Sequence, residues 1–93
     1  MCTLFNRPAV QKCIWAALNE EYNANVKDDT SLRNRTKGLG LDDTEIRNNT
    51  YDVITKAVKD KGCRLTKLTP AGLARCKTVG DVVDAVTDDI LSN

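Results

Sequence analysis

The fold is decided by the stretch Lys77-Thr78-Val79-Gly80-Asp81-Val82-Val83-Asp84-Ala85-Val86. Thr78 can cap a helix that begins directly after it, and Asp81 stands three residues later, where it imitates the second member of a capping box. Apolar side chains then recur at helical spacing, which predicts one buried face. The members of that face are Val79, Val82, Val83, Val86, Ile90 and Leu91.

A first helix is predicted over residues 8–22. Proline suits the first turn of a helix, and apolar residues follow it at intervals of three and four. Trp15 lies at the edge of this stripe, so we expect it to belong partly to the core rather than to form a platform for a ligand. The stripe itself consists of Val10, Cys13, Ile14, Ala17 and Leu18.

A second helix is expected to begin at Asp42 or Asp43. A carboxylate at that point can accept backbone N–H groups and oppose the positive end of the helix dipole. Residues 48–50 are Asn-Asn-Thr, which are poor helix formers, so the first turns are expected to be irregular. Gly62 is a natural stop. The core face of this helix would consist of Ile46, Val53, Ile54, Ala57 and Val58.

Two further segments complete the predicted architecture. Residues 23–42 lack periodicity, and a loop of this length either contains a helical turn near residues 30–34 or serves as an interaction surface. Leu32 and Leu39 are its isolated apolar positions. Thr69 and Pro70 predict the cap and first turn of a short helix that ends near Cys76. We therefore expect one all-α domain over residues 1–93, a four-helix bundle with three longer helices and a short third one.

Length and composition argue against several classes of protein. Ninety-three residues are too few for separate catalytic and substrate domains, and 41% hydrophobic with 29% charged residues is ordinary for a folded chain. The longest apolar runs, such as residues 14–18, fall far below the roughly 20 residues that a membrane span requires. No secretory signal is visible. The expectation is a cytoplasmic monomer that does not enter a membrane.

The cysteines and the absence of histidine limit the chemistry. Four cysteines could form two disulfides, but Cys2, Cys13, Cys63 and Cys76 lack the close spacing of a stapled scaffold or a zinc knuckle. Cys13 and Cys76 fall on apolar faces, where a reduced thiol is usually a small buried side chain. No histidine is present to activate a thiol. We expect no metal site, no catalytic residue and no enzymatic activity.

Three short segments resemble acyl carrier proteins. They are Asp29-Thr30-Ser31-Leu32, which is similar to part of that family's long loop, Leu39-Gly40-Leu41-Asp42-Asp43, which is similar to the approach to its second helix, and residues 76–86, which are similar to the start of its last helix. The order of a long helix, a long loop, a second helix, a very short third and a closing fourth also matches the family. The resemblance covers nearly the whole chain and implies a small acyl-carrier-like four-helix bundle.

In that family a serine after an aspartate carries 4′-phosphopantetheine, and the matching position in this chain is Asp43. A carboxylate cannot form the required phosphodiester, so no cofactor is expected at this position. Ser31, Ser92 and Thr44 also carry hydroxyls, but none lies in the family's Asp-Ser-Leu setting. Asp42 and Asp43 are interpreted as helix-capping residues rather than as a catalytic pair.

Charge gives a second departure from the family, whose typical members have an acidic second helix. Residues 33–77 contain eleven Lys or Arg and five Asp or Glu, a formal charge of +6, although the whole chain carries only +1. These charges form either a solvated surface or a patch for an anionic partner. The last helix is acidic instead, through Asp81, Asp84, Asp88 and Asp89.

The sequence therefore favours an atypical acyl-carrier-like protein that acts through protein–protein contact. Its candidate contact residues are Arg47, Lys56 and Lys59, and the expected partner is a protein with an acidic surface. One alternative is a true carrier that is loaded at another hydroxyl. The other is a small helical nucleic-acid-binding module, which ranks lower because the net charge is near neutral and aromatic residues are scarce.

Overall fold

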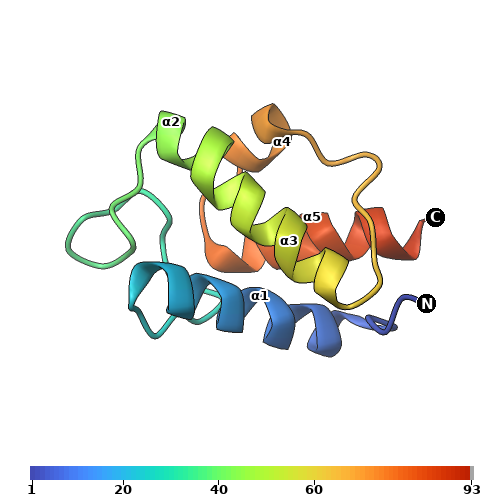
Figure 1. Ribbon diagram of the computed structural model, residues 1–93. Coiled ribbons are helices and arrows are strands. Elements are labelled where there is room, and N and C mark those ends of the chain that lie inside the picture. The colour runs from blue at the N-terminus through green and yellow to red at the C-terminus, as the bar shows by residue number, and fades with distance from the viewer. Residues whose placement is uncertain (93) are drawn as a thin grey trace.

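The computed structural model describes residues 1–92, which form helices joined by loops (Figure 1). Helix α1 spans Arg7–Tyr22, and a second long helical segment consists of α2 (Asp43–Glu45), the π-helix η1 (Ile46–Thr50) and α3 (Tyr51–Asp60). A short α4 (Pro70–Ala74) precedes α5 (Val79–Leu91). The described part of the chain contains no strand, which confirms the all-α prediction.

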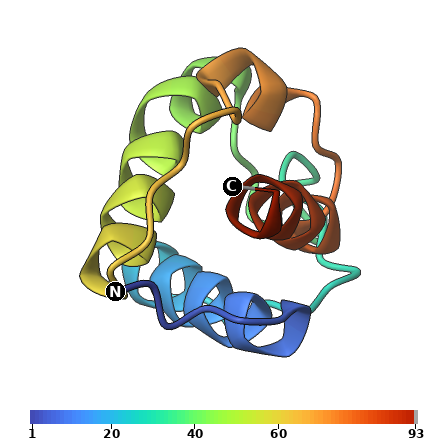
Figure 2. The same cartoon turned by 90° about the vertical axis from the view of Figure 1, so that its right-hand side faces the viewer.

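Three helical segments surround one core. Helix α1 packs against both α3 and α5, while α4 packs on η1, so that the helices enclose a shared interior when viewed end-on (Figure 2). The predicted faces supply most of this interior. Its fully buried members include Val10, Ile14 and Leu18 of α1, Ile46, Ile54 and Val58 of the second segment, and Val79, Val82, Val83 and Val86 of α5.

Six positions predicted to belong to the core faces are not buried, namely Cys13, Ala17, Val53, Ala57, Ile90 and Leu91. The prediction for Leu91 is wrong, because this side chain is 52% exposed on the last turn of α5, which extends past α3 (Figure 1). Val53 and Ala57 are only half-buried and line a surface groove next to α1. Trp15 is half-buried and packs against the core, as expected.

The irregular start predicted for the second helix is confirmed. In η1 the backbone N–H of Tyr51 donates to the carbonyl of Ile46, which lies five residues earlier. In an α-helix the acceptor carbonyl lies four residues earlier. The poor helix formers Asn48, Asn49 and Thr50 occupy this turn. The wider turn directs the hydroxyl of Thr50, which is fully buried, toward α1.

The long loop between α1 and α2 contains no helical turn at residues 30–34, which excludes the first of the two alternatives for this segment. Ser31 instead forms isolated bridges with Gly38 and Thr78. The N–H of Leu32 donates to the carbonyl of Lys77 at 2.9 Å, which fixes the loop to the start of α5. Backbone hydrogen bonds satisfy both polar groups of Leu32 while its side chain enters the core, where it is fully buried.

Asp28 anchors the same loop to two helices. Its carboxylate accepts hydrogen bonds from Arg7 at 2.9 Å and from Gln11 and Trp15 at 3.1 Å each, all of them on α1. Its backbone carbonyl accepts the N–H of Gly80 at 2.8 Å, and a Cβ at position 80 would lie 2.9 Å from that carbonyl oxygen. Glycine is therefore required for this close approach of loop and α5.

A disulfide joins Cys2 to Cys63. The sequence leaves this pair open, since folding brings together two residues that are 61 positions apart. The predicted reduced thiols are confirmed for Cys13 and Cys76, of which Cys76 is buried and Cys13 is half-buried. Disulfides are typical of oxidising compartments, whereas the predicted location is the cytoplasm; that location stays a prediction.

The segment before α1, residues 1–5, contains few buried contacts. Fixing residues 1–5 costs about 1–2 kcal/mol of backbone entropy per residue. Full burial of one leucine side chain recovers about 1.5–3 kcal/mol, and Leu4 is the only residue of this segment with a buried side chain. The disulfide adds a covalent connection between this segment and Cys63.

Among the described residues, no helix combines the length and apolar character needed to cross a bilayer.

Candidate partner-binding site at the start of α2

Asp42 and Asp43 form the beginning of α2, as the sequence predicts. Asp42 is the N-cap, and its Oδ1 accepts the backbone N–H of Glu45 at 2.7 Å. Asp43 is the first helical residue, with an exposed side chain. The approach to this helix is held in place because the N–H of Leu41 donates to the carbonyl of Leu32 at 2.8 Å.

The carboxylate of Asp43 forms ion pairs with two arginines, one before it and one after it in the sequence. Arg47, one turn later on the same helical segment, donates from Nε to Oδ2 at 2.5 Å. Arg33 of the preceding loop donates from Nη2 to Oδ1 at 3.3 Å. The hydrogen bond from Arg47, supported by Arg33, lowers the pKa of Asp43 below its ordinary value. Asp43 is therefore an ionised, paired group at neutral pH.

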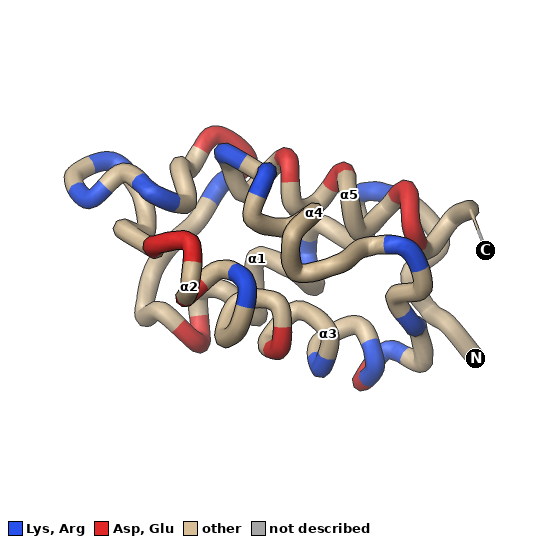
Figure 3. Tube along the Cα trace, turned by 90° about the horizontal axis from the view of Figure 1, so that it is seen from above, with Lys and Arg blue, Asp and Glu red and all other residues tan. Residues whose placement is uncertain are grey.

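Arg33 also connects the site to α4. Its Nη2 donates to the carbonyl of Ala74 at 2.5 Å, which satisfies a carbonyl at the end of that short helix. Arg75 follows directly, and Lys77 lies opposite Leu32 through the backbone hydrogen bond described above; both side chains are exposed. We refer to Arg33, Arg47, Arg75 and Lys77 as the basic corner. Figure 3 shows basic residues of the loop, of η1 and of the connection between α4 and α5 at the same end of the molecule as the acidic start of α2.

The three contact residues predicted from the sequence do not share one surface. Arg47 belongs to the basic corner. Lys56 pairs with Asp52 at 3.1 Å and lines a groove between α1 and α3 that also contains Glu20 and Glu21. Lys59 lines a different groove, together with Thr55, Cys63, Arg64 and Leu65. Positions 47, 56 and 59 therefore point toward three different neighbours.

The three hydroxyls considered for modification occupy different settings. Thr44 is exposed on α2, next to Asp43. Ser31 is half-buried, and its Oγ accepts the N–H of Asn34 at 3.1 Å. The hydroxyl of Ser92 donates to the carbonyl of Asp88 at the end of α5. Thr44 is thus the hydroxyl that lies beside the candidate site.

The thiols are poorly suited to act as nucleophiles. Burial raises the pKa of Cys13, and burial together with the nearby Asp81 and Asp84 raises the pKa of Cys76 to about 11. A thiol with a raised pKa contains little thiolate at neutral pH. Within residues 1–92, no group of three or more Cys, Asp or Glu side chains is arranged so that it could hold a metal ion.

A polar network beside the site was missed by the sequence interpretation. The hydroxyl of Tyr22 donates to Glu45 at 3.0 Å and shares a 2.6 Å hydrogen bond with the hydroxyl of Thr50. Asn49 donates from Nδ2 to Glu45 and to Glu21, each at 2.7 Å. The network joins the end of α1 to α2 and η1. The only signal for it in the sequence is the unfavourable Asn-Asn-Thr run inside a predicted helix.

Asp89 also differs from its sequence interpretation, which grouped it with the acidic residues of the last helix. Its side chain is buried, with 3% of the residue exposed. The carboxylate accepts backbone N–H groups of Thr66, Lys67 and Leu68 at 3.0, 2.8 and 2.6 Å. It therefore holds the loop before α4 against α5 and leaves Asp81, Asp84 and Asp88 as the exposed acidic residues of that helix.

Comparison of the chain with protein-family models, with curated proteins and with solved structures found no match.

Proposed function

We propose that this chain is an acyl-carrier-like domain that acts through protein–protein contact and carries no prosthetic group at position 43. The observation that carries the proposal is the Arg33–Asp43–Arg47 arrangement at the start of α2. A carrier would need a hydroxyl there. A carboxylate cannot accept phosphopantetheine, and its two ion pairs close the position and join the loop to the second helical segment.

The proposed contact surface is the basic corner, and the proposed partner is a protein with an acidic surface. Asp43 pairs with Arg33 and Arg47, so Arg75 and Lys77 are the cations of the corner that make no ion pair among the described residues. Both side chains extend into solvent. Complementary charge accelerates association and selects partners, so the corner favours carboxylate-rich surfaces.

Nucleic acid is the less favoured partner. The exposed Asp81, Asp84 and Asp88 of α5 place negative charge on the helix that follows the corner, where it would repel phosphates. The one tryptophan cannot serve as an open stacking platform, because Trp15 is half-buried and donates its indole N–H to Asp28.

The first experiment tests the absence of loading. Wild-type chain and the Asp43→Ser variant are incubated with coenzyme A and a promiscuous phosphopantetheinyl transferase, and their intact masses are measured. We expect no addition to the wild type and one phosphopantetheine on the variant. Addition to the wild type at Thr44, Ser31 or Ser92 would instead make it a loaded carrier. An unmodified variant that remains folded would remove support for a carrier-like site.

The second experiment tests the contact surface. Crosslinked partners are captured from the native cell with three proteins: the wild-type chain, the Arg75→Glu/Lys77→Glu variant and the Lys59→Glu variant. Lys59→Glu is the matched control, because Lys59 lines a groove away from the basic corner. We expect the corner variant to lose an acidic partner that the wild type and the control both retain. Equal capture by all three proteins would reject the basic corner as the contact surface. If only the Lys59→Glu control loses the partner, the contact surface lies at Lys59 instead.

A further inference from the structure

Residues 1–5, which we call the strap, lie across one end of the groove between α1 and α3. Thr3 and Leu4 line this groove together with Ala9, Cys13 and Ala57. Leu4 is 4% exposed, so its side chain is inserted into the core, whereas Phe5 beside it is 69% exposed. The strap is therefore attached through one apolar side chain and a few polar contacts.

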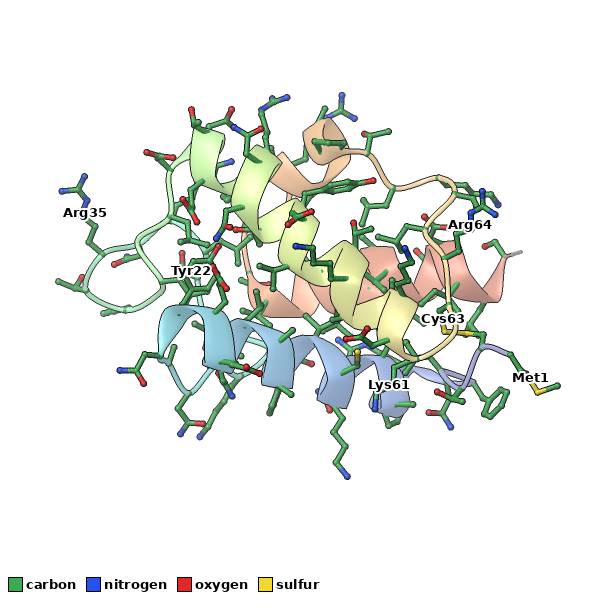
Figure 4. All side chains as sticks on the ribbon, in the orientation of Figure 1. Met1, Tyr22, Arg35, Lys61, Cys63 and Arg64 are labelled. Carbon is green, nitrogen blue, oxygen red and sulfur yellow. A yellow bond between two sulfur atoms is a disulfide. The ribbon has the colours of Figure 1, made fainter. Side chains whose placement is uncertain are left out.

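Those polar contacts converge on the end of α3. The N–H and the hydroxyl of Thr3 donate to the carbonyl of Lys61 at 2.9 and 3.2 Å. Gly62 has a φ of 75°, and a Cβ at this position would lie 2.2 Å from the carbonyl oxygen of Met1. Cys63 then forms the disulfide with Cys2. Figure 4 shows Met1, Lys61 and Cys63 at this same end of the molecule.

We propose that the disulfide makes the strap a redox-controlled cover of the α1–α3 groove. While Cys2 and Cys63 are joined, the strap is docked and closes the end of the groove next to Cys13. When the disulfide is reduced, the remaining contacts do not offset the backbone freedom that residues 1–5 regain, so the strap detaches. The helices stay folded, because their core consists of the buried residues of α1, the second segment and α5.

The reductant is a dithiol, and its chemistry follows the exposure of the two sulfurs. Cys2 is half-buried and Cys63 is buried, so the attacking thiolate reaches the sulfur of Cys2 first. This forms a mixed disulfide and releases the Cys63 thiolate, which takes a proton from water. The second thiol of the reductant then attacks the reductant's sulfur in the mixed disulfide, and Cys2 leaves as a thiolate that takes up a proton. Two electrons pass to the protein, and the reductant becomes a cyclic disulfide.

Two thiols of the chain provide a matched pair of reporters. Cys13 lines the groove beside Thr3 and Leu4, so detachment of the strap exposes it further. Cys76 is buried at 8% exposure in the connection between α4 and α5, and its thiol donates to the carbonyl of Gly72. Cys76 therefore reports global unfolding, while Cys13 reports opening of the groove.

The experiment compares oxidised wild type, wild type in dithiothreitol and the Cys2→Ser/Cys63→Ser variant. Hydrogen exchange is followed for residues 1–6 and for α5, and alkylation of Cys13 and Cys76 by iodoacetamide is followed by peptide mass spectrometry. With the disulfide open, we expect the Thr3 amide to lose its protection and Cys13 to react roughly tenfold faster, while Cys76 and the α5 amides remain protected.

Two results would overturn the proposal. If residues 1–6 remain protected and Cys13 reacts at its original rate after reduction, then the strap is held without the disulfide. If Cys13 and Cys76 accelerate together and α5 loses protection in both the reduced protein and the variant, then the disulfide maintains the whole fold and is not a local cover.

Discussion

The carboxylate of Asp89 accepts the backbone N–H of Leu68 at 2.6 Å, although the two residues lie in different segments and Asp89 is almost completely buried. The same carboxylate accepts the N–H groups of Thr66 and Lys67. A buried charge is tolerated only when it is well paired, and here backbone donors fulfil that role. Asp89 thus gives the loop before α4, which contains no helix or strand of its own, a fixed position on α5.

Replacement of Asp89 by alanine should lower the free energy of unfolding by about 2–3 kcal/mol, because buried N–H groups lose their acceptor. Urea denaturation at pH 7 measures this loss, and faster hydrogen exchange at residues 66–68 locates it. Asp88→Ala is the matched control, since that neighbouring side chain is exposed. An equally small change for both variants would contradict the structural role of Asp89.

Asp89 also predicts a pH dependence. Burial alone would raise its pKa, but the backbone N–H bonds from Leu68, Thr66 and Lys67 outweigh burial, so the pKa lies below the ordinary value. Folding therefore favours the ionised form, and this stabilisation is complete above about pH 4 and is lost as the pH falls through the folded pKa. The stability difference between wild type and Asp89→Asn should accordingly shrink in urea denaturation at pH 3. A difference that grows toward acid pH would show that the sign is wrong.

Gly80 should tolerate no side chain. An alanine Cβ would lie 2.9 Å from the carbonyl oxygen of Asp28, and backbone must move to admit it. We expect Gly80→Ala to cost about 1–3 kcal/mol in thermal or urea unfolding. The matched control is Gly72→Ala, where the nearest atom is the flexible Cδ1 of Leu68 at 3.3 Å. That change should be neutral or stabilise α4 by up to about 1 kcal/mol; the reverse order of the two variants would contradict the packing.

The Tyr22–Thr50 hydrogen bond should show coupling between its two partners. Tyr22→Phe leaves the buried Thr50 hydroxyl without this partner, and we expect a loss of about 1–2 kcal/mol. Thr50→Val alone should also destabilise. Because removal of both partners leaves neither one unpaired, the double variant should lose less than the sum of the single variants. Additive losses in a double-mutant cycle would show that the 2.6 Å contact contributes nothing specific.

Reduction of the Cys2–Cys63 disulfide should lower stability. The crosslink spans 61 positions, and the chain-entropy model assigns a loop of that length on the order of 4 kcal/mol. Urea unfolding of oxidised and reduced protein measures the difference. A Cys76→Ala variant under oxidising conditions controls for effects of thiol loss elsewhere. An unchanged midpoint on reduction would mean that the unfolded chain is not restricted by the crosslink.

The helices were predictable because their signals are local. Thr78 accepts the N–H of Asp81 and forms the expected capping box, and Thr69 caps α4 before Pro70. The buried roles of Asp89 and Cys63 were not predictable in the same way, because their partners are 21 to 61 positions away in the sequence. A carboxylate on an apolar helix face resembles a surface charge until the donors that surround it are known.

The candidate site was predictable in part. The position of Asp43 follows from helix-cap chemistry, and its contact with Arg47 follows from the spacing of four residues along a helix. Arg33 reaches the same carboxylate because bridges of Ser31 and the Leu32–Lys77 hydrogen bond hold its loop beside the start of α5, a contact that helix spacing does not predict. Lys56 and Lys59 lie in α3, after the π-helical turn that contains Arg47. They line two different grooves, because Lys56 faces residues of α1 whereas Lys59 faces the loop after α3.

The Asp43–Arg47 pair should be visible in the titration of Asp43. Arg47 makes the larger contribution to the lowered pKa of this carboxyl, and Arg33 makes a smaller one. Both Arg47→Gln and Arg33→Gln should therefore raise the pKa of Asp43 toward its ordinary value, and Arg47→Gln should raise it more. Carbon-13 NMR of the side-chain carboxyls measures both shifts. Asp28 is the internal control, because Arg7 and not the basic corner holds it, and its titration should not change in either variant. A larger effect of Arg33→Gln, or no effect of either change, would contradict the geometry on which the closed Asp43 position depends.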